Sequence, residues 1–352
     1  MGALSHAARY EDDAGRETLT GMESPDSRAG SYGREPYHSK DDSNSGAAVE
    51  PSLSPGIMDA ETERRIQKAR ERTPRYLFRC WNNADFPSGG HEDLNTTAAI
   101  TPLAFSSYGS GGDPSIYHLS RKALGDMVAS HLHGENVATQ FSSWAASLQT
   151  AFTFDSGLPG NCYVSIIDTK RLPNNVILHV PSMDFLLGES SACDHEYLAH
   201  GVISGPAHKA VPLWAFIEVA PHFYGTGIPR SHFPGPAPIG SYSSIYWEEV
   251  ADARWVGDMY GGSFVVPVTI AILCQQQRHG KFWRGSAPDL DIVALALADC
   301  EIPAELCQDA TVLTDIVYTF GFGDVEQMIR LLRALVRHRY DQGASGQRSK
   351  SE

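Results

Sequence analysis

The pattern of apolar and polar positions predicts strands in the middle of the chain and helices toward its end. Strand segments are rich in aromatic and β-branched residues or alternate between apolar and polar positions. We expect strands at residues 75–81, 162–169, 175–180, 184–188, 196–205 and 210–219. Between them, residues 140–154 start as a strand and continue with helical spacing, which predicts a strand-to-helix junction.

Helical spacing and capping residues predict the helices. Residues 58–72 form a charged helix with Asp59 or Thr62 near its start, and residues 119–132 form a helix with Ser120 as N-cap. Three further helical patterns are expected in 265–279, 289–300 and 324–340, with Pro267 in a first turn and Asp324 as an N-cap. The predicted class is α+β, with split antiparallel sheets and few helices, followed by a helical C-terminal region.

Composition divides the chain into five parts. Residues 1–73 are predicted to be a disordered arm with the one helix near its end, because residues 1–57 have too few apolar side chains to offset the chain entropy. An α+β domain is predicted at 74–220, a Pro/Gly-rich linker at 221–242, a helical region at 243–341 and a disordered tail at 342–352.

Charge and composition exclude some functions. The formal net charge of −14 disfavours binding to a nucleic-acid backbone and suits protein partners. No apolar run is long enough to span a membrane, and the N-terminus lacks the apolar stretch of a secretory signal. The six cysteines include no CxxC pair, so we expect reduced thiols in a cytoplasmic or nuclear protein.

The stretch CDHEYLAHGVISG, residues 193–205, places titratable groups before an apolar segment. It could be a zinc site, a pair of catalytic carboxylates or a polar strand end. Zinc is disfavoured because His195 and His200 are five residues apart, which separates them on a helix and on a strand alike. A nucleophilic pair of Cys193 and His195 lacks an orienting third group.

Strand geometry favours the carboxylates. Asp194, Glu196, Leu198 and His200 would alternate onto one face, which brings two carboxylates together. When two carboxylates are held close together, the pKa of one of them is raised. Such pairs are typical of acid/base catalysts or of groups that stabilise a cation.

Two other positions have open interpretations. Arg79 lies near the end of an otherwise apolar strand, which would suit an edge strand with the charged head in solvent. Ser142 and Ser143 lie at the strand-to-helix junction, where one of them could cap the helix or take part in a site.

Three motifs in order carry a resemblance to a known family. They are LFRC around Arg79, FSSWAASLQTA from Phe141, and DHEYLAHGVISG from Asp194. Together they resemble the Arg–Ser–Glu class of ADP-ribosyltransferases, in particular its cholera-toxin-like branch, over residues 75–220. The chain is still more similar to a group of fungal domains that share LFRCWN, LNTTxAITP and FSSWAASL and have no assigned activity. It departs from the transferase pattern at Cys80, Trp144 and Asp194.

The resemblance implies a glycosyl transfer from NAD, used as a substrate and without a metal, to a protein acceptor. It implies that Glu196 stabilises the oxocarbenium-like ribose and that Asp194 orients or deprotonates the acceptor. Arg79 would hold the pyrophosphate by a forked contact, and Ser142 and Ser143 would belong to the NAD-binding motif, with Ser142 bracing Glu196 or the ribose. His195 and His200 would be structural.

Two hypotheses therefore remain open. One is an intracellular NAD-dependent mono-ADP-ribosyltransferase whose helical C-terminal region selects a partner. The other is a catalytically decayed binding module on the same fold, which the three departures favour.

Overall fold

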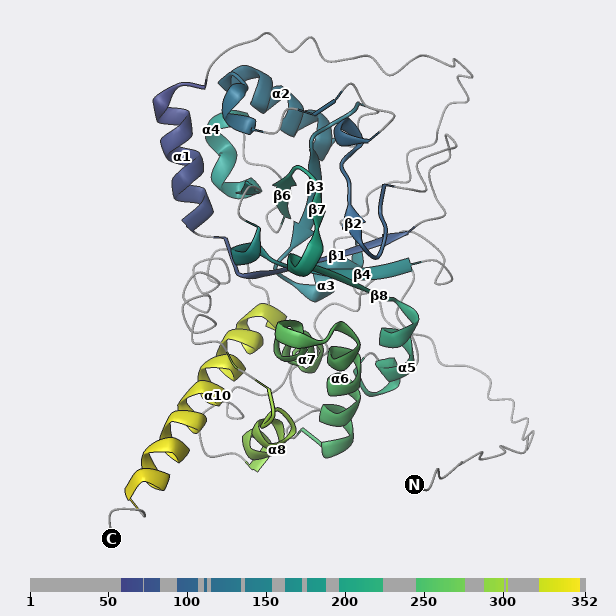
Figure 1. Cartoon of the computed structure of the whole chain (residues 1–352), viewed down its shortest axis with the longest axis vertical. Coiled ribbons are helices and arrows are strands. Elements are labelled where there is room, and N and C mark those ends of the chain that lie inside the picture. Colours follow the sequence, from purple (N-terminus) through teal and green to yellow (C-terminus); the bar gives the residue numbers. More distant parts are fainter. Residues whose placement is uncertain are drawn as a thin grey trace, which may run out of the picture. The chain divides into compact units, whose positions relative to one another are not determined.

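Six antiparallel strands form the main sheet, in the order β5-β6-β3-β1-β4-β8 (Figure 1). The structure, a computed structural model, describes residues 58–71, 73–82, 94–106, 111–112, 115–133, 137–153, 162–172, 176–187, 196–223, 245–275, 288–300, 302 and 323–348. The strands are β1 Tyr76–Asn82, β3 Phe141–Ala145, β4 Cys162–Asp168, β5 Ile177–His179, β6 Glu196–His200 and β8 His208–Pro212. A separate two-stranded sheet pairs β2 Ala99–Ile100 with β7 Ile203–Ser204.

Helices precede, interrupt and follow these strands. In the first part of the described chain they are α1 Ala60–Glu71, α2 Arg121–Leu132, α3 Leu148–Thr153, α4 Asp184–Leu187 and α5 Trp214–Phe223. The C-terminal part contains α6 Trp247–Tyr260, α7 Val265–Leu273, α8 Pro288–Ala296 and α10 Gly323–Arg348. The protein is therefore a mixed α+β protein with an antiparallel sheet, and the helical character predicted for the C-terminal region is confirmed.

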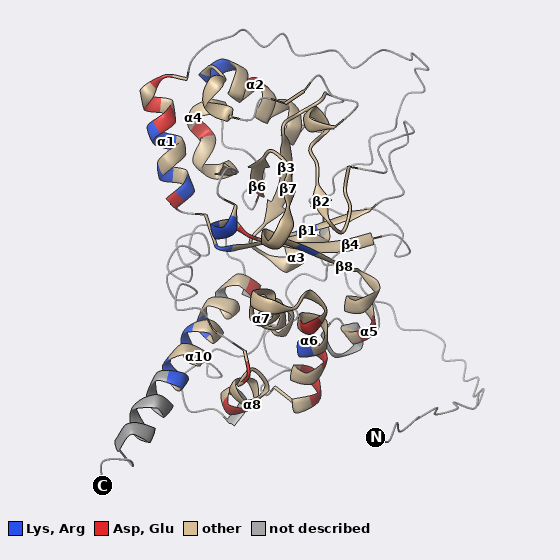
Figure 2. Cartoon of the chain, viewed as in Figure 1, with Lys and Arg blue, Asp and Glu red and all other residues tan. Residues whose placement is uncertain are grey.

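Local sequence explains where the first helices begin. The Asp59 side chain accepts a hydrogen bond from the Thr62 N–H at 2.8 Å, and the Ser120 hydroxyl accepts one from the Ala123 N–H at 3.2 Å. Each side chain satisfies a backbone donor that has no partner within the helix. Both predicted caps are confirmed, with Asp59 as the capping residue of α1. In α1, Glu61 and Glu63 lie in the first turn and Lys68 and Arg70 in the last, as the helix dipole favours, although the helix ends at the acidic Glu71 (Figure 2).

Several predicted elements are wrong. Residues 184–187 form α4 rather than a strand, and the strand expected at 210–219 covers only the end of β8 before α5 begins at Trp214. The strand expected at 196–205 is divided into β6 and β7 by Gly201, whose φ of 85° lies in the left-handed region. α5 runs into the predicted linker, and α10 continues through Arg348 into the predicted tail.

The two halves of the main sheet differ in direction. The register between β1 and β3 places Phe78 opposite Ala145, whereas β1 and β4 pair along the whole of β1. In Figure 1, β3 and β6 run steeply across the direction of β1, β4 and β8. One continuous sheet thus takes the place of the split sheets that the sequence predicts, and its strong twist lies at the β1–β3 junction.

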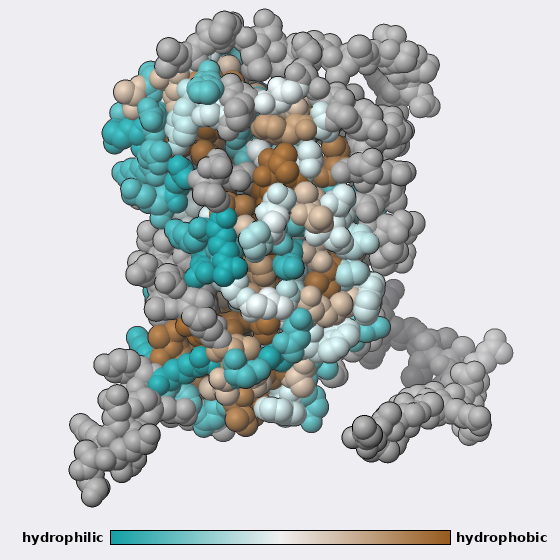
Figure 3. All heavy atoms as spheres, viewed as in Figure 1, coloured by the Kyte–Doolittle hydropathy of each residue, from teal (hydrophilic) through white to brown (hydrophobic). Residues whose placement is uncertain are grey.

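Two clusters of buried apolar residues flank this sheet. The smaller cluster joins α1 and α2 to β3, β5 and β6, with Ile66, Met127, Phe141 and Leu198 among its members. Figure 3 shows the opposite, hydrophilic side of α1 at the surface. The larger cluster contains residues of β1 and β4 together with residues of α3, α5, α6, α7 and α10.

Specific contacts join the C-terminal helices to the sheet. The Tyr260 hydroxyl, at the end of α6, donates to the Val164 carbonyl of β4 at 2.7 Å. The Tyr76 ring of β1 meets Phe264 edge to face at 6.1 Å. All described residues lie within the compact unit Ala47–Glu352. The predicted arm, residues 1–57, and most of the predicted linker fall outside the described residues.

None of the described helices combines the length and the apolar character needed to cross a bilayer.

Candidate functional site

The three strands that carry the sequence-predicted site residues are neighbours. Arg79 lies on β1, Ser142 and Ser143 on β3, and Glu196 begins β6, and these strands are consecutive in the sheet. Glu196 is paired with Ala145, and Ala145 with Phe78, the residue before Arg79. Residues that lie far apart in the sequence are thus brought together: Glu196, Ala145 and Phe78 form one row across the sheet, and Arg79 is the next residue on β1.

Arg79 connects two of these strands through its side chain. β1 lies between β3 and β4, so the expectation of an edge strand is wrong. Nη1 of Arg79 donates to the Ser143 carbonyl at 2.7 Å, while the buried Nε has no hydrogen-bond partner within the described part of the chain. Burial lowers the pKa of Arg79 to about 10, and the negative charge of Glu196 opposes this shift. Arg79 is therefore a cation held in a poorly solvated place beside a carboxylate.

Glu196 is the carboxylate whose negative charge acts on Arg79. It is nearly buried, with 9% of its surface exposed, and it shares the electrostatic interaction with Arg79 described above. Glu196 has Leu198 and His200 on the same strand face, as alternation predicts. Asp194, the other predicted catalytic carboxylate, lies outside the described residues, as do Cys193 and His195.

Ser142 and Ser143 point to opposite sides of β3. The Ser142 hydroxyl accepts a hydrogen bond from the Trp144 indole N–H at 2.9 Å and lies 3.5 Å from the Ala199 carbonyl. Ser143 is on the strand face of Glu196, because it is paired with Leu198. The expected bracing of Glu196 by Ser142 is not found. Neither serine caps α3, because Ser147 accepts from the Thr150 N–H at 3.0 Å and performs that role.

His131 is a member of the site that the sequence interpretation missed. Its Nε2 lies 2.9 Å from the Ser143 hydroxyl, and its Nδ1 lies 2.8 Å from the Thr139 hydroxyl. Burial, with a smaller contribution from Arg79, lowers its pKa to about 4, so the imidazole is neutral at pH 7. A signal existed in the sequence, since His131 lies four residues after Met127 on the buried face of α2.

The neighbouring polar residues belong to the fold. Arg75 forms a bidentate ion pair with the buried Asp168, with Nε–Oδ1 and Nη2–Oδ2 distances of 3.1 and 2.9 Å. His200 lies 2.7 Å from the Gln140 side-chain oxygen and packs edge to face against Phe141. The structural role predicted for His200 is therefore confirmed.

Two departures from the transferase pattern also have structural roles. Trp144 is fully buried and meets the His208 ring edge to face at 6.5 Å. Cys80 is a buried thiol within the larger apolar cluster. Both side chains contribute to packing next to the site.

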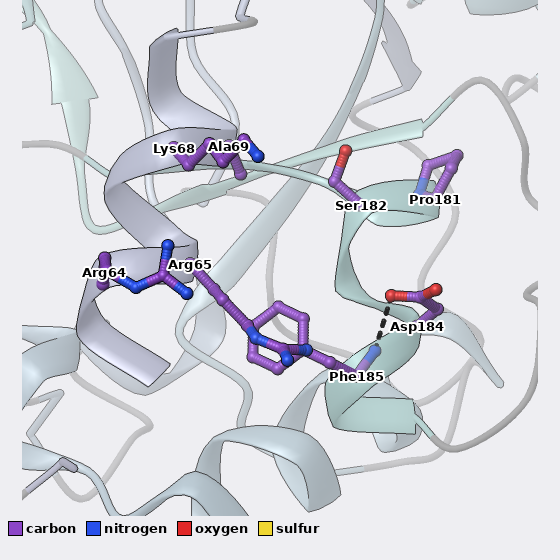
Figure 4. A pocket seen from close by; sticks show the side chains of 8 residues that line it. All are labelled: Arg64, Arg65, Lys68, Ala69, Pro181, Ser182, Asp184 and Phe185. Atoms are coloured by element: carbon purple, nitrogen blue, oxygen red, sulfur yellow. Dashed lines mark hydrogen bonds between the residues drawn. The ribbon is translucent and has the colours of Figure 1, made fainter. Parts of the chain in front are cut away.

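The described residues include a surface cavity but no candidate metal-binding group. None of their His, Cys, Asp and Glu side chains form a group of three or more that could hold a metal ion. A cavity of about 440 Å³ lies between α1 and α4, where Arg64, Arg65 and Lys68 face Ser182 and Phe185 (Figure 4). No predicted site residue lines this cavity.

Part of the chain matches a protein family. Residues 72–207 match a family described as "Domain of unknown function (DUF7587)". The match contains β1, β3 and β6, and therefore the whole Arg79–Glu196 row, and it ends before β8 and the C-terminal helices. Neither the comparison with curated proteins nor that with solved structures finds a match.

Proposed function

We propose that residues 74–220 form an ADP-ribosyltransferase-like domain that transfers ADP-ribose from NAD to an intracellular protein. The observation that carries this proposal is the placement of Arg79 and Glu196 on β1 and β6, the two neighbours of β3, where the charge of Glu196 opposes the lowering of the pKa of Arg79 by burial. A cation and a carboxylate at one place fit the two ends of the reacting dinucleotide, since the pyrophosphate is anionic and the reacting ribose develops positive charge.

Arg79 would bind the pyrophosphate. A guanidinium has several donors in a fixed fork, and within the described residues Nη1 of Arg79 donates to the Ser143 carbonyl. Its Nε lacks a partner within the described chain, so an incoming phosphate oxygen would supply the missing acceptor. The neutral state of His131 leaves Arg79 as the positive charge of this cluster.

Glu196 would act at the ribose. Breaking the nicotinamide–ribose bond creates positive charge on the sugar carbon, which a nearby carboxylate stabilises. Ser143, whose hydroxyl lies 2.9 Å from Nε2 of His131, would take the bracing role that the resemblance implies for Ser142. Asp194 would orient or deprotonate the acceptor nucleophile.

A second candidate function is a binding module that has lost catalysis. The hydrogen bond from Trp144 to Ser142 favours it, because this contact removes the first serine of the motif from the neighbourhood of Glu196. In this alternative the fold and the row of residues persist, but NAD is not cleaved.

The test is nicotinamide release from NAD by the full-length chain, with and without a cell lysate, together with transfer of labelled ADP-ribose to protein. We expect turnover in the wild type and a loss of about 100-fold or more in Glu196→Gln, which keeps the shape but removes the charge. Glu63→Gln, on the exposed side of α1, is the matched control and should retain full turnover. Absence of turnover from the wild type, despite NAD binding, would support the binding module.

A further inference from the structure

An exposed aromatic surface lies on α5 and α6. Seven large apolar side chains are exposed within the described residues, and four of them are Trp214, Trp247, Trp255 and Met259, each between 38% and 48% exposed. We name these four the tryptophan surface. The rings of Trp214, at the start of α5, and Trp255, on α6, lie 6.3 Å apart. Exposed tryptophans of this density are typical of protein-binding hot spots.

The packing of α6 fixes the direction of this surface. At about 100° per residue, Trp247, Trp255 and Met259 fall within an arc of about 120° on the helix. The opposite side is buried and approaches α7 closely at Gly257, where a Cβ atom would lie 2.5 Å from the Thr269 hydroxyl. This contact leaves little freedom for α6 to rotate, so the tryptophans stay at the surface.

Carboxylates are interleaved with the tryptophans. Glu248, Asp252 and Asp258 fall within or next to the same arc of α6, and Figure 2 shows the acidic residues on this helix. Arg254, the basic residue of α6, is fully engaged: Nε donates to Asp258 at 2.7 Å, and Nη1 donates to the Ala296 carbonyl at the end of α8 and to Asp299. Asp258 is therefore already paired, and Glu248 and Asp252 are the carboxylates of this side that Arg254 does not contact. The exposed side of α6 is therefore both aromatic and acidic.

We propose that the tryptophan surface binds an arginine-bearing basic segment of a partner protein. Charge complementarity selects this occupant, since arginine can stack on the indole faces and donate to the neighbouring carboxylates at the same time. The negative charge of the chain, −14, assists the approach of such a segment. The inference does not depend on NAD chemistry, because the surface lies outside the residues of the Arg79–Glu196 row.

Fluorescence anisotropy with the full-length chain tests the proposal. The probe is a labelled 12-residue peptide of alternating arginine and leucine, and the controls are the same peptide with every arginine replaced by lysine or by glutamate. We expect binding that falls with added salt, weaker binding of the lysine peptide and none of the glutamate peptide.

Variants locate the binding. Trp255→Ala and Trp214→Ala should each weaken the arginine peptide about tenfold or more, and Glu248→Gln should weaken it and reduce its salt dependence. Leu295→Ala removes an exposed apolar side chain of α8 and should bind as the wild type. Circular dichroism and thermal unfolding check that each variant is folded, as expected for exposed positions.

Three outcomes would overturn the proposal. They are no binding of the arginine peptide by the wild type, equal loss in Leu295→Ala and the tryptophan variants, and equal binding of the arginine and glutamate peptides. A concentration-dependent dimer that Trp255→Ala abolishes, without peptide binding, would instead assign the surface to a second copy of the chain. Binding to neutral phosphatidylcholine vesicles without peptide binding would assign it to a lipid surface.

Discussion

At the scale of residues, the candidate site depends on the side of β3 on which each hydroxyl lies. Ser143 shares the strand face of Glu196 and lies 2.9 Å from His131 Nε2, whereas Ser142 lies on the other face and accepts from Trp144. The sequence did not separate the two serines, because the side of β3 on which each one lies depends on the pairing register with β6; bracing of the ribose by Ser142 stays a prediction. His131 was missed because its partners, Ser143 and Thr139, are set by the packing of α2 on the sheet.

Two buried histidines predict the pH dependence of stability. Burial lowers the pKa of His131 and of His208 to about 4, against an ordinary value of 6.5. Below pH 6.5 the unfolded chain therefore binds more protons than the folded chain. The stabilisation is complete above pH 6.5 and is lost as the pH falls from about 6.5 toward 4, with a slope of up to about 1.4 kcal/mol per pH unit for each histidine.

Urea unfolding between pH 7.5 and pH 4.5 measures this slope. His131→Gln retains hydrogen-bonding groups for Ser143 and Thr139 but cannot titrate, so its slope should be smaller than that of the wild type. His133→Gln, at the exposed end of the same helix, is the control and should keep the wild-type slope. An unchanged slope in His131→Gln would show that His131 is not held neutral by the fold.

At the scale of elements, long patterns with caps were predicted well and short apolar runs were not. α1, α2, β1 and β4 have a clear period and suitable end residues. The run at 184–187 was mistaken for a strand because four residues are too few to show whether the apolar positions repeat with the period of a helix or of a strand. The second half of 210–219 became α5 because a turn at Leu213 ends β8, and the apolar run alone does not mark this turn.

The α6–α7 contact gives a prediction at this scale. A Cβ at Gly257 would lie 2.5 Å from the Thr269 hydroxyl and 2.8 Å from the Val265 carbonyl. Gly257→Ala should therefore destabilise the protein by about 1–3 kcal/mol, although alanine has the higher helix propensity. Gly125→Ala in α2, where the nearest atom would lie 3.0 Å away, should cost less. The measurement is the free energy of unfolding in urea, and a Gly257→Ala protein as stable as the wild type would contradict the close approach.

At the scale of the whole molecule, the sequence suggested a helical region that could be separate from the sheet. One apolar cluster instead contains residues of β1 and β4 and residues of α6, α7 and α10. Composition could not reveal this, because the apolar faces of the helices are equally suited to packing on each other and on a sheet. The α+β class with antiparallel strands was predicted, while the continuous sheet and the joining of the two regions through Tyr260 and Val164 required the structure.

A buried carboxylate links distant parts of this molecule and gives a further prediction. Oδ2 of Asp324, in the first turn of α10, accepts from the Ser147 hydroxyl at 2.7 Å, so it is a link to α3 rather than the predicted N-cap. Burial raises the pKa of Asp324, so its contribution to stability is lost as the pH rises through that pKa. Asp324→Asn should keep an acceptor for Ser147 and stabilise the protein at pH 8, because the charged form of the buried carboxyl is no longer required there.

Thermal unfolding at pH 8 and pH 4.5 measures this difference. The advantage of Asp324→Asn should shrink at the lower pH, where more of the wild-type carboxyl is protonated. Asp126→Asn, an exposed carboxylate of α2, should show no such advantage. A destabilised Asp324→Asn protein at pH 8 would mean that the charge itself is needed at the start of α10.

The most direct test of the proposed site is calorimetric titration of the full-length chain with NAD. The account predicts binding to the wild type, loss of about tenfold or more in affinity in Arg79→Lys, and unchanged affinity in Ser142→Ala, whose hydroxyl is engaged by Trp144. Thermal unfolding of each variant verifies that the fold is retained. No heat of binding with the wild type, or equal affinity in Arg79→Lys, would contradict an NAD site at the meeting of β1, β3 and β6.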